Sequence, residues 1–338
     1  MAQPAAKIFD SGKKFSRSLK EVTKPVQFHI DEFRTFFRDS IQTDVYLLDK
    51  IINYLLKQKG KEVRPTLVFM TARMFGEIDN RSYVAATMIE LLHTATLIHD
   101  DVVDESDKRR GLLSINKLWK NKAGVLLGDF LLSKGLLIAL DHKEYALLHV
   151  LSTAVRKMSE GELRQLKTSR LFNMTEERYY QIISEKTASL IAACCHCGAI
   201  AATDEEHIQH EIQEIGMKIG ISFQIMDDLF DYGIADVGKP KRNDIQERKV
   251  TLPLIKALEG SNKIEQLQIR RLMRKRKKTS EDVDRIVHFV HDMGGMLKAR
   301  QAMELHAEEA LERLRKLPVN EGYDDFEALV QFIITRSK

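Results

Sequence analysis

The chain has 338 residues, 43% of them hydrophobic and 30% charged, and these proportions exclude a globally disordered protein. Its 53 lysines and arginines exceed its 49 aspartates and glutamates by only four, too weak a bias to indicate a nucleic acid partner. With only 6 prolines and 17 glycines, the composition favours helices over a many-stranded sheet protein.

The expected elements are helical along almost the whole chain. Residues 1–27 are polar and basic, and we expect a loosely ordered arm, with a helix on a membrane surface as the alternative. The helical periodicity predicts helices over about residues 33–55, 65–75, 83–103, 113–140, 145–166, 175–202 and 205–231, and several shorter helices from residue 252. Since neither an alternating strand pattern nor a linker is present, we predict one large all-α domain over residues 28–338.

The cysteines and the apolar segments predict where the protein resides. Cys194, Cys195 and Cys197 are close neighbours in an apolar helical stretch, so we expect them to be reduced and packed in the core. The first ten residues lack the apolar segment of a secretory signal. The longest membrane-span candidate, residues 123–140, is interrupted by Asp129 and Lys134. We therefore expect a soluble, cytoplasmic protein.

Two clusters of aspartates carry the clearest chemical signal. The first cluster is Asp100, Asp101 and Asp104, and the second cluster is Asp227, Asp228 and Asp231. Each ends a long apolar helix, and its spacing places three carboxylates on roughly one helix face. Like charges one turn apart cost about 0.2–0.5 kcal/mol per pair, and negative charge opposes the dipole at a helix C-terminus. A solvated acidic face explains this poorly, and carboxylate oxygens predict bound Mg²⁺ in contact with substrate phosphates.

Basic residues lie where they could hold such an anionic substrate. They are Lys61, Arg64, Arg109, Arg110, Lys186 and Lys239. Arginine offers phosphate a bidentate fork and lysine a point charge, although a single basic residue is more often a surface residue. His93 shares a helix face with Asp100 and Asp104, so it is either a ligand-binding residue or a core histidine.

Six segments together resemble a known family. In chain order they are GKEVRP, LLHTATLIHDDVVDESDKRRG, EKTASL, GISFQIMDDLFD, GKPKRNDI and KVTLPL. They are similar to the trans-isoprenyl diphosphate synthases, specifically the long-chain polyprenyl diphosphate synthase branch, over about residues 30–335. The resemblance implies a helical bundle around a deep central cavity and a homodimer. It also implies Mg²⁺-dependent head-to-tail (1'-4) condensation of isopentenyl diphosphate with an allylic diphosphate by ionisation, condensation and elimination, giving a long all-trans product.

The resemblance also implies roles for individual residues. The two clusters would hold three Mg²⁺ ions on the allylic diphosphate, which would also contact Arg109, Lys186 and Lys239. The isopentenyl diphosphate site would contain Lys61, Arg64, His93 and Arg110. Thr187 and Gln224 match positions that stabilise the developing allylic cation. One position departs from the family's G-K-x-x-G-x-D pattern, because Arg242 replaces its second glycine; this puts in question the loop's conformation and the placement of Lys239.

The residues before the first cluster predict the product length. Ala95 and Thr96 lie about one helical turn before Asp100, and both are small. Members of the resembling family that make short products usually have a bulky aromatic residue there. We therefore expect an open tunnel and a long product, with the final stop at Phe69 or on the helix over residues 125–140.

Four other functions remain as alternatives. The first two are a synthase of geranylgeranyl or farnesyl diphosphate and a non-catalytic subunit of a heteromeric prenyl synthase. A class I terpene cyclase would use an N-D-x-x-S-x-x-x-E pattern, which Asn243 and Asp244 could open but Glu247 interrupts. A helical scaffold protein would leave the six aspartates unexplained. The basic arm is also a possible peripheral membrane contact for release of an apolar product.

Overall fold

The computed structural model describes residues 18–57, 60, 62–109, 111–171, 174–233 and 242–335. Within them nearly all regular structure is helical, as the sequence predicts. The α-helices are α1 Leu19–Thr23, α2 Gln27–Ser40, α3 Tyr46–Leu56, α4 Val63–Phe75, α5 Asn80–Val103, α6 Ile115–Asp141, α7 Tyr145–Leu171, α8 Glu176–Ile183, α9 Ser189–Ala202, α10 Glu206–Asp231, α11 Asn243–Gln246, α12 Leu252–Glu259, α13 Lys263–Arg274, α14 Ser280–Asp292, α15 Gly295–Leu314 and α16 Glu321–Thr335. The shorter elements are a 3₁₀ turn Lys24–Val26, a π-helical turn Ser184–Ala188, and the strands β1 Lys108–Arg109 and β2 Leu112–Leu113.

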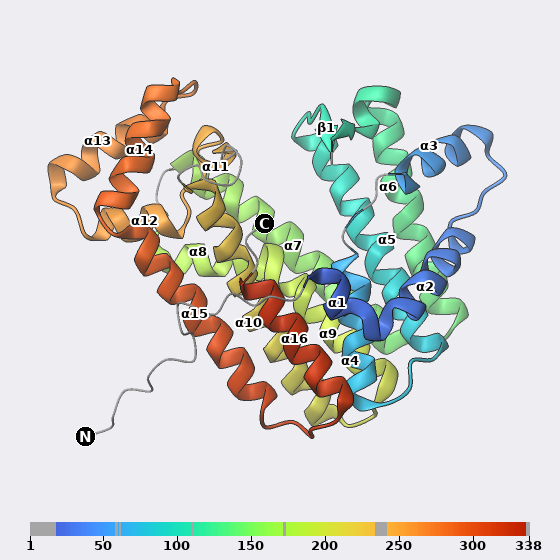
Figure 1. The fold of residues 1–338 in the computed structure, drawn as a ribbon. Helices are drawn as coiled ribbons and strands as arrows, with labels where there is room; N and C mark the ends of the chain where they lie inside the picture. Colours follow the sequence, from blue (N-terminus) through green and yellow to red (C-terminus); the bar gives the residue numbers. More distant parts are fainter. Residues whose placement is uncertain are drawn as a thin grey trace.

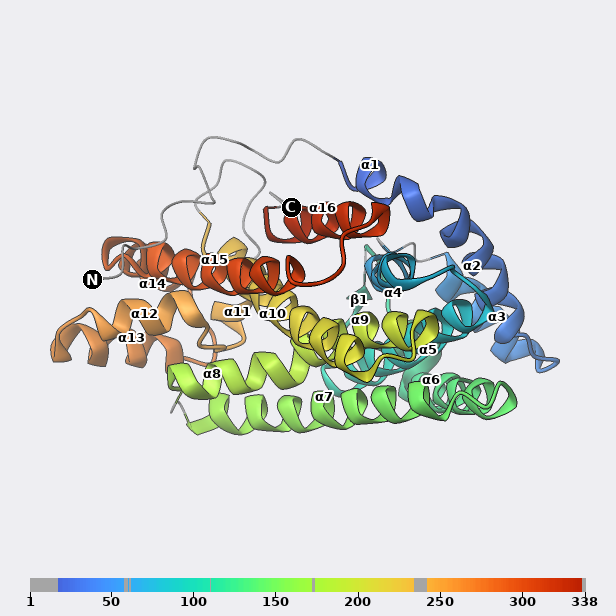
Figure 2. The same cartoon turned by 90° about the horizontal axis from the view of Figure 1, so that it is seen from below.

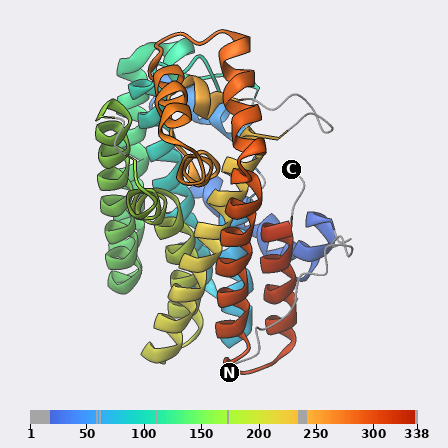
Figure 3. The same cartoon turned by 90° about the vertical axis from the view of Figure 1, so that its left-hand side faces the viewer.

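The helices form a layered bundle around α9 (Figure 1). Helix α9 contacts α4, α5, α7 and α10, and its side chains, including the three cysteines, are almost all buried. Figures 2 and 3 show α7 along one side of the bundle and α15 and α16 on the opposite side. The cysteines therefore pack in the core as expected, and burial raises their thiol pKa values.

Local sequence signals set several of the helix starts. The Asp79 side chain accepts the backbone N–H groups of Arg81 and Ser82 at the start of α5. Thr175 caps α8, and Thr279 forms a capping box with Asp282 at the start of α14. The starts of α8 and α14 match the expected ones, whereas α5 begins at Asn80, before the expected residue 83. At each start a side-chain oxygen satisfies N–H groups that the helix itself leaves unbonded.

Two expected helices differ from the observed ones, and one observed element was not expected. The helix expected over residues 33–55 is two helices, α2 and α3, because the chain turns at the fully buried Ile41. The helix expected over residues 175–202 contains the π-helical turn. A short hairpin, β1–β2, occurs where no strand was expected, and Gly111 between its strands has a left-handed φ of 82° that favours glycine.

The basic arm is shorter than expected. Residues 18–26 belong to the expected arm, yet they form α1 and the 3₁₀ turn, and the side chains of Val22 and Val26 are buried. They pack against α16 and α4, so apolar burial orders this part of the chain. Residues 1–17 lie outside the described residues.

Helix α6 is unusually apolar and exposed. By length and composition it could cross a membrane, with a mean hydropathy of 1.8 over its best window, although we expected charges to prevent this. One such helix is weak evidence of a span, because a helix of a soluble protein passes the same test. Its glycines face α5: a Cβ on Gly128 would lie 2.1 Å from Nε2 of His99, so only glycine permits this close contact.

Candidate active site

Two cavities bring the predicted site residues together. The first-cluster cavity, about 700 Å³, is lined by Arg64, His93, Thr96, Asp100, Lys186 and Thr187 among others. The second-cluster cavity, about 240 Å³, is lined by Lys186, Thr187, Gln224, Asp228 and others. Lys186 and Thr187 line both cavities, so residues from α5 and α10 meet at one place. In Figure 1, α5 ends beside β1 and α10 ends near α11, both at the upper end of the bundle.

The three aspartates of the first cluster have different surroundings. Asp100 lines its cavity, where burial, Glu162 and Asp104 raise its pKa while Lys186 opposes them. Asp101 is only 4% exposed, and both of its oxygens accept hydrogen bonds from Arg109 at 2.7 Å. Asp104 is exposed at the helix end. Arg109, expected to contact a diphosphate, therefore also holds Asp101 in place.

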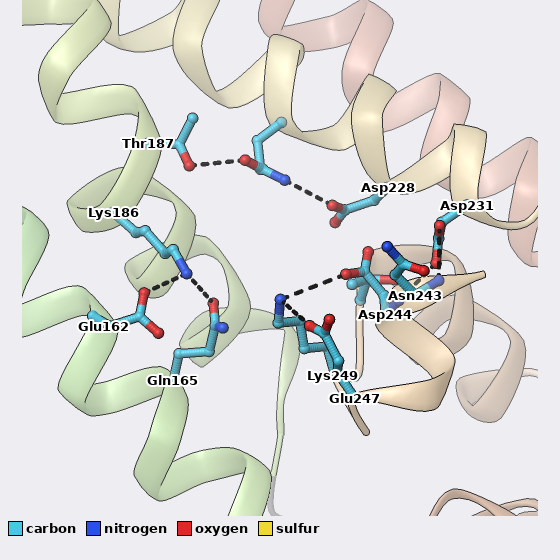
Figure 4. Close-up of polar contacts among 12 residues, drawn as sticks. Glu162, Gln165, Lys186, Thr187, Asp228, Asp231, Asn243, Asp244, Glu247 and Lys249 are labelled. Atoms are coloured by element: carbon cyan, nitrogen blue, oxygen red, sulfur yellow. Dashed lines mark hydrogen bonds and ion pairs between the residues drawn. The ribbon is translucent and has the colours of Figure 1, made fainter. Parts of the chain in front are cut away.

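The second cluster is divided in the same way. Asp227 is exposed, whereas Asp228 is 3% exposed and burial raises its pKa to about 8. Its Oδ2 accepts the Tyr179 hydroxyl at 2.6 Å, and its Oδ1 accepts Nε2 of Gln224 at 2.9 Å. Asp231 accepts the backbone N–H groups at the start of α11 at 3.3 and 2.8 Å (Figure 4). Its carboxylate thus anchors α11 as well as being a candidate metal ligand.

The π-helical turn presents Lys186 and Thr187. Such turns often occur at functional sites. Lys186 pairs with Glu162 of α7, and its Nζ lies 3.4 Å from Oε1 of Gln165 (Figure 4). Thr187 donates its hydroxyl to Oε1 of Gln224 at 2.8 Å. Through Lys186 and Thr187, the turn therefore connects Glu162 of the first-cluster cavity with Gln224 of the second-cluster cavity.

Arg64 and His93 also line the first-cluster cavity. An Arg64 guanidinium nitrogen, Nη1, lies 3.7 Å from Oε2 of Glu90, and the His93 side chain is buried. Glu62, which precedes α4, has a left-handed φ of 50° and pairs with Arg34 of α2. Three further expected contacts, Lys61, Arg110 and Lys239, lie outside the described residues.

The two predicted chain-length residues point in different directions. Thr96 lines the first-cluster cavity. Ala95 is fully buried, and it lines none of the cavities found in the described part of the chain. Leu91, Ile98 and Val102, which share a helix face with Ala95, lie next to glycines of α6, so Ala95 lies on the α5 face that packs against α6.

Three site residues were missed by sequence reasoning, and a fourth, Asp244, was considered only as part of a terpene cyclase motif. Glu162 faces Lys186, and Asp244, Lys249 and Tyr179 line the second-cluster cavity. Burial and Asp231 raise the pKa of Asp244 to about 6, while Lys249 opposes them. Asp244 and Lys249 follow the second cluster closely in sequence, which is a usable signal. Glu162 and Tyr179 stand in ordinary amphipathic helices, where no pattern distinguishes them.

The carboxylates fit divalent cations that arrive with an anionic ligand. Burial is the largest cause of the raised pKa values of Asp100, Asp228 and Asp244, and neighbouring carboxylates add to it, so a bound cation would favour their ionised forms. No group of three acidic, His or Cys side chains among the described residues already forms a metal site. Magnesium commonly takes one or two carboxylates and completes its shell with substrate phosphates, and this donor set suits that arrangement.

Comparisons of sequence and of structure with known proteins point to the same family. The polyprenyl synthetase family pattern matches residues 45–290. The octaprenyl diphosphate synthase of Escherichia coli (strain K12) is 34% identical over 282 residues, 83% of this chain and 87% of that protein. The crystal structure of a decaprenyl diphosphate synthase from Rhodobacter capsulatus has a TM-score of 0.89 at 30% identity, covering 95% of this chain and all of that one, 100%. A polyprenyl synthase from Caulobacter crescentus CB15, complexed with calcium and isoprenyl diphosphate, has a TM-score of 0.87 at 30% identity, covering 96% and 99%.

Proposed function

The chain belongs to the polyprenyl synthetase family and is a prenyltransferase, and we propose that it condenses isopentenyl diphosphate with an allylic diphosphate into a long all-trans polyprenyl diphosphate. The meeting of two cavities at Lys186 and Thr187, one lined by Asp100 of the first cluster and the other by Asp228 of the second, is the observation that carries this proposal. This arrangement provides one place for the diphosphate that leaves the allylic substrate and a second place, lined by basic residues, for isopentenyl diphosphate. The long-chain names of the relatives support the product class.

Three Mg²⁺ ions would bind with the allylic diphosphate. Asp100 lines the cavity and Asp104 and Asp227 are exposed, so these three would hold the ions directly. Asp101 is held by Arg109, Asp228 by Tyr179 and Gln224, and Asp231 by the start of α11. These three would support the residues that bind the ions. The ions would neutralise charge on the diphosphate as it leaves.

The protein's own residues would guide the rest of the reaction. Lys186 would exchange Glu162 for a diphosphate oxygen, since an ammonium pairs with either anion. Arg64 and His93, which line the first-cluster cavity, would hold isopentenyl diphosphate. The family resemblance adds Lys61 and Arg110 to this set. Apolar walls, such as Leu97, Ile191 and Phe223, would exclude water that could quench the carbocation. The departing diphosphate would accept the proton lost in the elimination step.

The direct test is turnover by the purified protein alone. We expect labelled isopentenyl diphosphate and farnesyl diphosphate, with Mg²⁺, to give a product ladder longer than geranylgeranyl on reverse-phase chromatography. Replacing Asp100 or Asp227 with Ala should reduce the rate by at least about 100-fold, as loss of charge-stabilising groups typically does. A short product would keep the reaction and refute the length. No incorporation with any allylic starter would favour a non-catalytic subunit.

We also propose a cytoplasmic homodimer that pairs through α6. The outer face of this helix exposes large aliphatic side chains, about half exposed or more at Leu126, Leu137 and Leu140. A row of this kind is costly to leave in water and is typical of an interface. Residues 1–17 would provide the peripheral membrane contact expected from their basic charge; their removal should then weaken binding to anionic liposomes.

A further inference from the structure

Asp228 is held from both sides by side chains that do not belong to the aspartate clusters. The Tyr179 hydroxyl donates to Oδ2 and the Gln224 amide donates to Oδ1. Tyr179 and Asp228 are each 3% exposed, so water does not replace either bond readily. The orientation of the Asp228 carboxylate is therefore fixed by the protein interior.

That orientation determines which partner each end of the Gln224 amide contacts. An amide has one donor end and one acceptor end. Because Asp228 takes the donor end, the carbonyl end accepts the Thr187 hydroxyl at 2.8 Å. The Thr187 hydroxyl hydrogen is therefore directed at Gln224, and Thr187 lines both cavities.

We propose that Tyr179 is a positioning residue for the prenyl transfer, holding Asp228 so that the oxygens of Gln224 and Thr187, not their hydrogens, face the developing carbocation. Oxygen dipoles fixed in advance stabilise a positive charge without reorganising during the reaction. If Asp228 turned, the Gln224 amide could also turn and present its N–H groups to the cation. The inference rests on the proposed function and adds a residue to it.

The hydroxyl of Tyr179 can be tested apart from its ring. The ring packs in a core cluster with Ala188, Ile225 and Leu229, and Phe would preserve this packing. Tyr180 provides a matched control, since its ring lies edge-on to Tyr179 at 5.6 Å and to His306 at 5.4 Å between centroids. Tyr179→Phe and Tyr180→Phe therefore remove the same atom from adjacent buried or half-buried rings.

The first readout is equilibrium binding by calorimetry with Mg²⁺ and two unreactive probes. Farnesyl thiodiphosphate is neutral at the reacting carbon, and an aza analogue of farnesyl diphosphate carries a protonated amine there. We expect Tyr179→Phe to weaken binding of the aza analogue by about tenfold or more, as is typical when a residue that orients a binding group is changed. Binding of the thiodiphosphate should stay unchanged. Tyr180→Phe should change neither. Equal weakening of both probes, or of neither, would overturn the proposal.

The second readout is steady-state turnover. Tyr179→Phe should lower kcat about ten- to 100-fold while the KM for farnesyl diphosphate changes by less than about threefold, because the hydroxyl acts in the transition state. If this variant does not fold, Asp228→Asn must lower the same ratio of aza to thiodiphosphate affinity, and an unchanged ratio would refute the inference. Wild-type protein that binds neither probe would instead contradict the proposed function.

Discussion

Each aspartate cluster contains side chains with two kinds of surroundings. Asp101 and Asp228 are almost fully buried and bonded to Arg109 and Tyr179, whereas Asp104 and Asp227 are exposed. The repeated spacing predicts carboxylates at the ends of two helices, but not which of them are available to a metal ion. That distinction depends on partners outside each cluster, such as Tyr179, which lies 49 positions before Asp228 in the sequence.

The directions in which Thr96 and Ala95 point from α5 predict which substitution shortens the product. Thr96→Tyr would place a ring in the cavity and should shift the product ladder toward geranylgeranyl or shorter, because Thr96 lines the cavity. Ala95→Tyr would instead press a ring into the packed α5–α6 contact and should lower the melting temperature, since overpacking typically costs about 1–3 kcal/mol. Product chromatography and thermal unfolding of both variants test this. A Thr96→Tyr enzyme with wild-type products would contradict the tunnel.

At the level of elements, the start of α11 explains the departure at Arg242. Arg242 precedes α11 with a left-handed φ of 51°, the conformation in which glycine is favoured, and it pairs with Asp284 of α14. Arg242 thus has a strained backbone conformation, and its side chain forms a partially exposed ion pair with Asp284. The position occupied by glycine in the family pattern is therefore tolerated here, and α11 still meets Asp231.

Two substitutions at this position separate strain from the ion pair. Arg242→Ala removes the pair but keeps a Cβ at positive φ, whereas Arg242→Gly removes both. We expect Arg242→Gly to be more stable than Arg242→Ala by about 1 kcal/mol in urea unfolding, because a left-handed conformation costs a residue with a Cβ roughly that amount. Equal stabilities would show that the backbone is not strained there.

At the level of the whole molecule, the exposed face of α6 predicts the assembly. Leu126→Glu combined with Leu137→Glu should convert a dimer into a monomer of 38.9 kDa, because charges would be buried in the interface. Light scattering after size-exclusion chromatography measures the mass. Leu267→Glu on α13 is the control, since Leu267 is 70% exposed on a different helix. A wild-type mass unaffected by the α6 pair, or equally affected by the control, would refute this interface.

The all-α class and both aspartate clusters could be predicted from the sequence, because helix periodicity, capping and charge spacing are local properties, and the resemblance of six segments indicated the family. That Ala95 faces α6, that Glu162 pairs with Lys186 and that Tyr179 holds Asp228 became visible only in the folded protein. These relations depend on how separate helices pack, and two helices with the same periodicity can present different faces to each other. Long-range contacts of this kind are set by the complementary burial of whole surfaces, which no single segment of the sequence contains.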